Sequence, residues 1–169
     1  ITEKKKTEEA LKESEERYRD QFDAAVDAIF IADVETGKVV DCNVEACKLV
    51  EREKSEIIGK SQTILHPPEK IKGKFSQTFK KHLKEKEGQV LETKVITKTG
   101  KIKDVAIKAS IFETNGKRLL HGIFRDITER KKIEEALNKE KEFSENSINA
   151  QSDTFFVFNS VTGKAIKWN

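Results

Sequence analysis

The sequence predicts an α+β domain whose five antiparallel strands are flanked by one helix at each end. Two strand-like apolar runs precede a helical region and three follow it, with short turns between neighbours. Segments rich in Glu, Lys and Arg, and free of Gly and Pro, bracket this block and favour helix. The chain has 169 residues, 37% charged and 36% hydrophobic, which is enough for one domain and its flanking segments.

The first flanking helix is predicted over residues 1–21. A spacing of three and four residues gives it a weak heptad seam, formed by Thr7, Leu11, Ser14, Tyr18, Phe22 and Ala25. A seam with so little leucine would pair weakly alone, so pairing would depend on the attached domain. A single solvated helix is the alternative.

The first strands are predicted at 28–34 and 39–42, as a hairpin around the turn Glu35-Thr36-Gly37-Lys38. Asn43 is expected to cap a following helix, and Ser55 a short turn that ends at Gly59. Pro67 and Pro68 are expected to start a longer helix over 69–86. Its core-facing stripe would be Ile71, Phe75, Phe79 and Leu83.

The last three strands are predicted at 89–97, 102–112 and 118–126, joined by hairpin turns into an antiparallel meander. The middle strand alternates apolar and polar residues, which indicates one buried face. Other strands are apolar on both faces, so the sheet must be covered on both sides. The internal helices would cover one side, and a flanking helix or a second subunit the other.

The chain contains an internal repeat with a spacing of 126 residues. ITEKKKTEEAL at 1–11 and ITERKKIEEAL at 127–137 share nine of eleven positions. At the same spacing, 22–43 and 148–169 share seven residues, among them a Thr-Gly-Lys turn. A period of this length indicates tandem domains rather than a solenoid. Because the chain starts at Ile1 and has no Met, we expect it to be part of a longer protein.

Several motifs in this order resemble those of PAS domains. They are Asp27-Ala28-Ile29, Asn43 with Ala46 and Leu49, Ser55 to Lys60, His66-Pro67-Pro68, Glu92, Lys98 to Lys101, and Arg125 to Lys131. The resemblance covers residues 22–130. It implies a linker helix at 1–21, a PAS domain at 22–126, a signalling helix at 127–147 and the truncated start of a following PAS domain at 148–169.

The resemblance also implies a role. The expected function is a sensory and relay module of a multidomain signalling protein, in the first place a two-component sensor histidine kinase in a phosphorelay. Its partners would be a second copy, bound through the flanking helices, and neighbouring PAS and kinase domains. A ligand-free dimerisation or spacer module is the alternative.

The junction after the last strand is the most specific motif, and it supplies the expected signal-coupling residues Asp126, Ile127, Thr128 and Glu129. Asp126 and Glu129 have the spacing of a reciprocal helix cap, and Thr128 is a second candidate cap. Either arrangement would join the strand to the helix, so that a shift of the sheet could move the helix.

By alternation and resemblance, a pocket would lie between the inner sheet face and the helices. It would be lined by Phe30, Ala32, Leu49, Ile58, Phe75, Phe79, Val95, Val105, Ile107, Ala109, Leu120 and Phe124. These residues either line a cavity for an unknown small ligand or fill a packed core, and the bulky phenylalanines favour the packed core.

No cofactor or catalytic site is expected. The Asn-Cys-Arg-Phe-Leu-Gln pattern of flavin-binding relatives has no match here. His82 is the one candidate for an axial haem ligand, the weakest alternative, because His66 fits a loop motif and His121 should face away from the pocket. Two Cys and three His show no metal-ligand spacing. Nucleotide-binding and hydrolase motifs are absent as well, so this segment is not expected to be an enzyme.

Charge and hydropathy exclude other classes. Residues 51–110 hold 15 Lys and Arg against 8 Asp and Glu, but the signs are interleaved, which favours a solvated face over nucleic-acid binding. No apolar run reaches the roughly 20 residues of a membrane span, so direct membrane contact is not expected. Two cysteines without a signal peptide indicate the cytoplasm.

Overall fold

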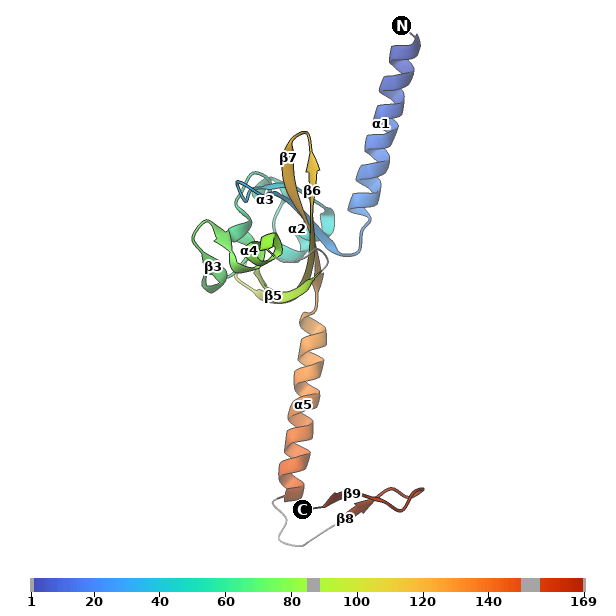
Figure 1. Cartoon of the computed structure of the whole chain (residues 1–169), viewed down its shortest axis with the longest axis vertical. Coiled ribbons are helices and arrows are strands. Elements are labelled where there is room, and N and C mark those ends of the chain that lie inside the picture. The colour runs from blue at the N-terminus through green and yellow to red at the C-terminus, as the bar shows by residue number, and fades with distance from the viewer. Residues whose placement is uncertain (1, 85–88, 150–155, 169) are drawn as a thin grey trace. The chain divides into compact units, whose positions relative to one another are not determined.

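The centre of the fold is a five-stranded antiparallel sheet with the strand order β2-β1-β7-β6-β5 (Figure 1). The computed structural model describes residues 2–84, 89–149 and 156–168, in one unit that ends at Thr128 and a second that begins at Glu129. The sheet comprises β1 (Ala28–Asp33), β2 (Val39–Cys42), β5 (Val90–Ile96), β6 (Ile102–Thr114) and β7 (Lys117–Asp126). These strands confirm the predicted α+β class.

Strand register puts the apolar residues of three strands on one face of the sheet. Ile107 of β6 lies opposite Phe124 of β7, which in turn lies opposite Ala28 of β1. Side chains alternate along a strand, so Phe30, Ala32 and Ala109 share this inner face. His121 of β7 lies on the opposite face, paired with Ser110.

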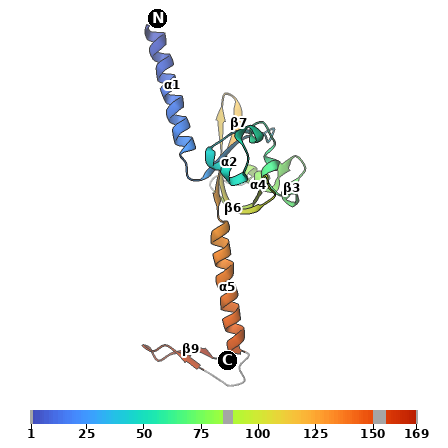
Figure 2. The same ribbon diagram turned by 180° about the vertical axis from the view of Figure 1, so that it is seen from behind.

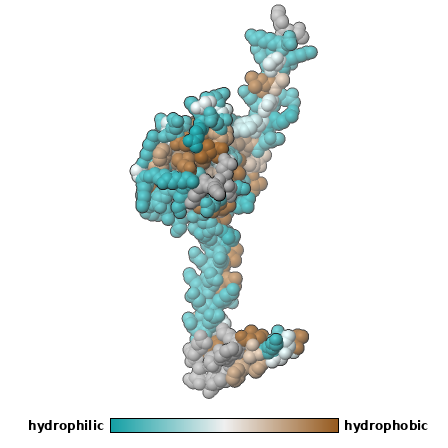
Figure 3. Space-filling view, in the orientation of Figure 1, coloured by the Kyte–Doolittle hydropathy of each residue, from teal (hydrophilic) through white to brown (hydrophobic). Residues whose placement is uncertain are grey.

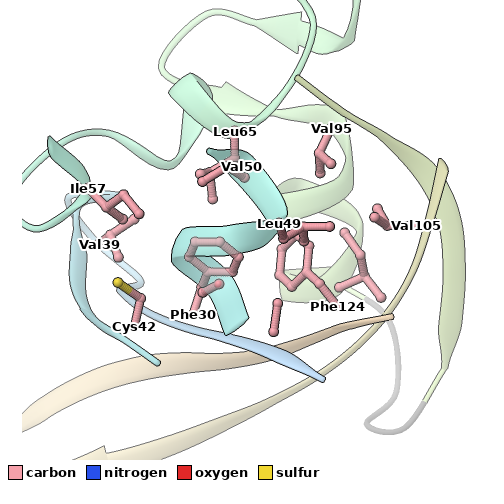
Figure 4. Close-up of a cluster of buried hydrophobic side chains, with 13 residues drawn as sticks. Phe30, Val39, Cys42, Leu49, Val50, Ile57, Leu65, Val95, Val105 and Phe124 are labelled. Atoms are coloured by element: carbon pink, nitrogen blue, oxygen red, sulfur yellow. The ribbon is translucent and has the colours of Figure 1, made fainter. Parts of the chain in front are cut away.

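Short helices cover the inner face and bury the core. They are α2 (Val44–Val50), α3 (Lys54–Ile57), η1 (Gln62–Leu65) and α4 (Gln77–Lys84). In both views, α4 lies on one side of β6 and β7 (Figures 1 and 2). Figure 4 shows Leu49 and Val50 of α2 between Phe30 and Phe124 of the sheet and Leu65 of η1. A second cluster contains Ala32, Phe79, Ala109 and Leu120.

The helix predicted over 69–86 is wrong in its first half. The chain instead forms η2 (Pro68–Lys70), β3 (Ile71–Lys72) and β4 (Phe75–Ser76) before α4 begins at Gln77. Gly73 turns the chain between β3 and β4 with φ +71°, a left-handed conformation that interrupts a helix. Phe75, Phe79 and Leu83 of the predicted stripe still pack in the second cluster.

The predicted cap of α3, the short helix that precedes this segment, is also wrong. The N-cap of α3 is Glu53 rather than Ser55, and its capping box is completed by Glu56, whose Oε2 accepts the backbone N–H of Glu53 at 3.0 Å. Asn43 caps α2 as predicted, because its side chain accepts the N–H of Ala46.

The first flanking helix, α1 (Thr2–Asp23), is exposed along most of its length and becomes buried only near its end, at Phe22. Tyr18 stacks on Phe22 with ring centroids 5.5 Å apart. Arg19 reaches β2, where its Nη1 lies 3.3 Å from Oδ2 of Asp41. The last turns of α1 are thereby attached to the sheet.

The second unit repeats the first elements of the first unit. It contains α5 (Thr128–Asn149) from Glu129 onward, β8 (Phe156–Phe158) and β9 (Ala165–Trp168). The bounds of α5 and β9 are those of α1 and β2 moved by 126 residues. Phe156 pairs with Trp168 as Phe30 pairs with Cys42, and both hairpins have a register shift at equivalent positions. The turn of this hairpin also repeats, with Gly163 at φ +66° and Gly37 at φ +69°.

Candidate functional site

A cavity of about 40 Å³ lies between the inner sheet face and the helices, next to the second core cluster. Its lining is mostly apolar. The lining residues are Phe30, Ala32, Val39, Gln62, Leu65, His66, Thr78, Phe79, His82, Ile107, Ala109, Leu120, Gly122 and Phe124.

Seven of the twelve predicted pocket residues line this cavity: Phe30, Ala32, Phe79, Ile107, Ala109, Leu120 and Phe124. The other five lie elsewhere in the core. Leu49, Val95 and Val105 are buried in the first cluster, and Ile58 packs against it. Phe75 packs against the second cluster.

The polar part of the lining comes from η1, the residue after it, and α4. His66 is buried, and its Nδ1 lies 3.2 Å from the carbonyl oxygen of Lys94. Because a carbonyl can only accept, Nδ1 carries the proton and Nε2 is left as an acceptor. Burial lowers the pKa of His66 below its ordinary value, so its ring is neutral at neutral pH. Thr78 donates its hydroxyl to Thr93 at 3.3 Å.

Gln62 is the other polar lining residue, and it is 3% exposed. Its backbone N–H donates to the carbonyl of Gly37 at 2.8 Å, and Ser61 caps the short helix in which it lies. Within the described residues, neither Nε2 nor Oε1 of its side chain has a hydrogen-bond partner.

Haem does not fit this cavity. His82 lines the cavity, although in the sequence it stands next to the core-facing stripe and not in it. A volume of about 40 Å³ holds a few water molecules, whereas a tetrapyrrole is many times larger. We derive no role for haem.

The start of α5 is tied to strand β6 by three hydrogen bonds to one peptide segment. The N–H of Ile127 donates to the carbonyl of Asp104 at 2.9 Å. The hydroxyl of Thr128 accepts the N–H of Asp104 at 3.0 Å and donates to its carbonyl at 3.4 Å. The carboxylate of Asp126 accepts the N–H of Thr128 at 2.9 Å. Among the predicted coupling residues, Ile127 is buried and Glu129 pairs with Lys132 at 3.7 Å.

The end of α1 is tied to the sheet by Asn43, which is fully buried. Its Nδ2 donates to the carbonyls of Phe22 and Asp27 at 3.1 and 3.0 Å. Its Oδ1 accepts the N–H groups of Ile29 and Ala46, both at 2.9 Å. One side chain thus joins the end of α1, the start of β1 and the first turn of α2.

An ion pair joins these two attachment points. Nε and Nη2 of Arg125, near the end of β7, donate to the two carboxylate oxygens of Asp27 at 3.1 and 2.7 Å. This fork geometry fixes orientation as well as distance. It also raises the pKa of Arg125 above its ordinary value.

Sequence reasoning named His82 but missed Gln62, His66 and Thr78 as cavity residues, and it missed the Asp27–Arg125 pair. Gln62 follows no periodic pattern, and nothing in the sequence marks it as buried. Asp27 and Arg125 are separated by 98 positions, and only the pairing of β1 with β7 brings them together.

The described residues offer no group of three or more His, Cys, Asp or Glu side chains that could hold a metal ion. Within the same ranges, no helix combines the length and apolar character needed to cross a membrane.

The fold and the junction define a PAS domain, and comparison with known proteins agrees. The family model described as "PAS domain" matches residues 26–129, more than half of the chain. The chain therefore belongs to the PAS domain family.

One curated protein and several solved structures are similar to this chain. The chain is 30% identical over 129 residues to the methyl sulfide methyltransferase-associated sensor of Methanosarcina acetivorans, covering 76% of this chain but only 13% of that protein. The PAS domain of an HTR-like protein from Haloarcula marismortui superposes with a TM-score of 0.60 at 19% identity, over 73% of this chain and 99% of that one. A PAS domain from a two-component sensor histidine kinase gives 0.58 at 13% identity, over 69% and 98%.

Proposed function

We propose that this PAS domain is a sensory relay module of a multidomain signalling protein, in the first place a cytoplasmic two-component sensor histidine kinase. A cue alters the sheet, and the junction Asp126 to Glu129 passes the change to helix α5. The observation that carries the proposal is the attachment of Ile127 and Thr128 to Asp104 of β6.

The geometry supports a direct mechanical link. Val105 and Ile107 follow Asp104 on β6, and Ile107 lines the cavity, so a change in the cavity reaches the strand that holds the start of α5. Two states of this strand with different affinities for the cue are enough to bias the helix.

The second unit supports a tandem arrangement of PAS domains. Its helix α5 and strand β9 reproduce the bounds of α1 and β2, and its hairpin reproduces the register and turn geometry of β1 and β2, at the spacing of the sequence repeat. We propose the domain division given by the motifs: a linker helix at 1–21, a PAS domain at 22–126, a signalling helix at 127–147 and the start of another PAS domain at 148–169.

Dimerisation through the flanking helices has support in their surfaces. Ile133 and Leu137 of α5 are exposed and lie one helical turn apart, and Leu11 and Tyr18 of α1 are exposed as well. Figure 3 shows hydrophobic side chains along one edge of the otherwise hydrophilic α5. A second copy would bury this edge as a coiled coil does.

The small cavity favours one second candidate, a module that relays helix register without any ligand. Autophosphorylation of a kinase that carries this chain distinguishes the ligand-sensing relay from the ligand-free module. If the proposal holds, Asp126→Ala abolishes the response to the cue while the core of the domain stays folded, and Ala109→Leu, which fills the cavity, weakens the response.

A spacer without ligand predicts a different pattern. Inserting one to three residues near Lys141 would change the output, whereas Ala109→Leu would leave it unchanged. Regulation that survives Asp126→Ala would contradict the junction mechanism.

A further inference from the structure

The amide of Gln62 is the polar group of the cavity that the fold leaves unexplained. The side chain is 3% exposed, lines the cavity and, within the described residues, has no partner for either amide atom. Burying an unpaired donor and an unpaired acceptor destabilises a protein. The unpaired Nε2 and Oε1 of Gln62 therefore point to a bound molecule that satisfies both.

Hydrogen bonds hold the backbone of Gln62, from which the side-chain amide extends. The N–H of Gln62 is bonded to Gly37 of the β1–β2 turn, and the next residue, Thr63, donates its N–H to the hydroxyl of Ser61 at 3.3 Å. Because its backbone is already held, Gln62 loses less conformational entropy on binding a ligand than a residue of a mobile loop would.

The charge of the lining selects a neutral ligand. The lining residues include no Lys, Arg, Asp or Glu, and of the two histidines in the lining, His66 and His82, burial keeps the His66 ring neutral. A cation that entered would lose its hydration without meeting an opposite charge, and an anion would meet none at His66.

The size of the cavity limits the ligand to a few atoms. A single water needs about 10–15 Å³ of this kind of volume, so about 40 Å³ corresponds to roughly three waters. Three waters occupy about 90 Å³ in the liquid, which is the volume of roughly four non-hydrogen atoms with their hydrogens.

We propose that Gln62 anchors a small neutral molecule that carries a hydrogen-bond donor and an acceptor on neighbouring atoms, as a short primary amide does. Two parallel hydrogen bonds would join the two amide groups, and the apolar lining would cover the rest of the ligand. This inference rests on the proposed sensory function and names the chemical class of the cue.

Three probes of four non-hydrogen atoms test it: acetamide, acetone and acetate. Each is titrated into the whole chain, and the backbone amide signals of Ala109 and Gly122, which line the cavity, are followed by NMR. Acetamide should give a saturable shift, acetone should bind at least about tenfold more weakly because it lacks the donor, and acetate should not bind.

Gln62→Leu and the matched change Gln21→Leu, on the exposed surface of α1, complete the test. Gln62→Leu should weaken acetamide binding at least about tenfold and raise the unfolding temperature of the ligand-free protein, which also shows that the variant folds. Gln21→Leu should leave acetamide binding unchanged.

The proposal is overturned if acetamide gives no saturable shift, if the three probes bind equally, or if acetamide binding survives Gln62→Leu. Each of these results would show that the Gln62 amide does not anchor an amide ligand. The relay proposal is judged separately by Asp126→Ala, so a protein that relays through the junction but does not bind acetamide would refute only the assignment of the ligand.

Discussion

At the scale of single residues, Asn43 shows how one side chain can organise several segments. It uses both amide donations and accepts two backbone N–H groups, and it is fully buried. A buried polar group with every bond made defines one arrangement of its neighbours, because any other arrangement leaves several groups unpaired.

We expect Asn43→Ala to lower the free energy of unfolding by about 3 kcal/mol, because it removes a helix cap and leaves two buried carbonyls unpaired. Asn43→Asp keeps the acceptor for Ile29 and Ala46 but loses both donations, so it separates the two contributions. Urea unfolding measures both variants. A loss below about 1 kcal/mol for the alanine variant would show that water replaces these bonds.

His66 should make the stability of the domain depend on pH. Its folded pKa lies below the ordinary value of 6.5, so the unfolded chain takes up a proton that the folded chain resists. Its contribution is complete above about pH 6.5 and is lost as the pH falls through that value toward the folded pKa, at up to about 1.4 kcal/mol per pH unit.

Urea unfolding between about pH 7.5 and pH 5.5 checks this expectation. His66→Gln should flatten the dependence, while a smaller slope of the same sign remains from His121, whose pKa is also lowered by burial. An equal slope in the wild type and in His66→Gln would exclude His66 as its source.

At the scale of elements, the sequence predicted the strands, which follow regular patterns, and missed the features that depend on a single residue. Apolar runs bounded by turn residues located all five strands of the sheet, and the family motifs located the junction. The segment 69–86 was mistaken for one helix because its apolar spacing of four continues across Gly73, whose left-handed backbone ends the pattern. Seven of the predicted pocket residues line the cavity, whereas Gln62 could not be found because its burial depends on tertiary packing.

Gly73→Ala distinguishes the two local structures by the sign of its effect. In a helix, alanine would stabilise the protein by about 1 kcal/mol. At φ +71°, with no atom within 4 Å of the added Cβ, the only effect is backbone strain, and we expect a loss of about 1 kcal/mol. Gly116→Ala, at φ +70° and also with no atom within 4 Å of the added Cβ, is the matched control and should lose a similar amount. A gain in thermal stability for Gly73→Ala would instead support the predicted helix.

At the scale of the whole molecule, the entry and exit of the domain are joined by a short chain of contacts. Asn43 binds the end of α1 and the carbonyl of Asp27, Asp27 pairs with Arg125, and Asp126 and Ile127 follow directly in sequence. This route gives a change at α1 a physical path to the start of α5 that does not cross the cavity. In the proposed relay, the preceding helix and the cavity would therefore be two inputs to the one output helix α5.

The most direct test of this account is native-state hydrogen exchange at the amides of Ile127 and Thr128. Their partners are the carbonyl of Asp104 and the carboxylate of Asp126. Asp27→Asn should speed exchange at both amides severalfold while the core amide of Val105 keeps its protection, and Asp20→Asn on α1 should change neither. Wild-type exchange at Ile127 and Thr128 in Asp27→Asn would show that the entry and exit of the domain are not coupled.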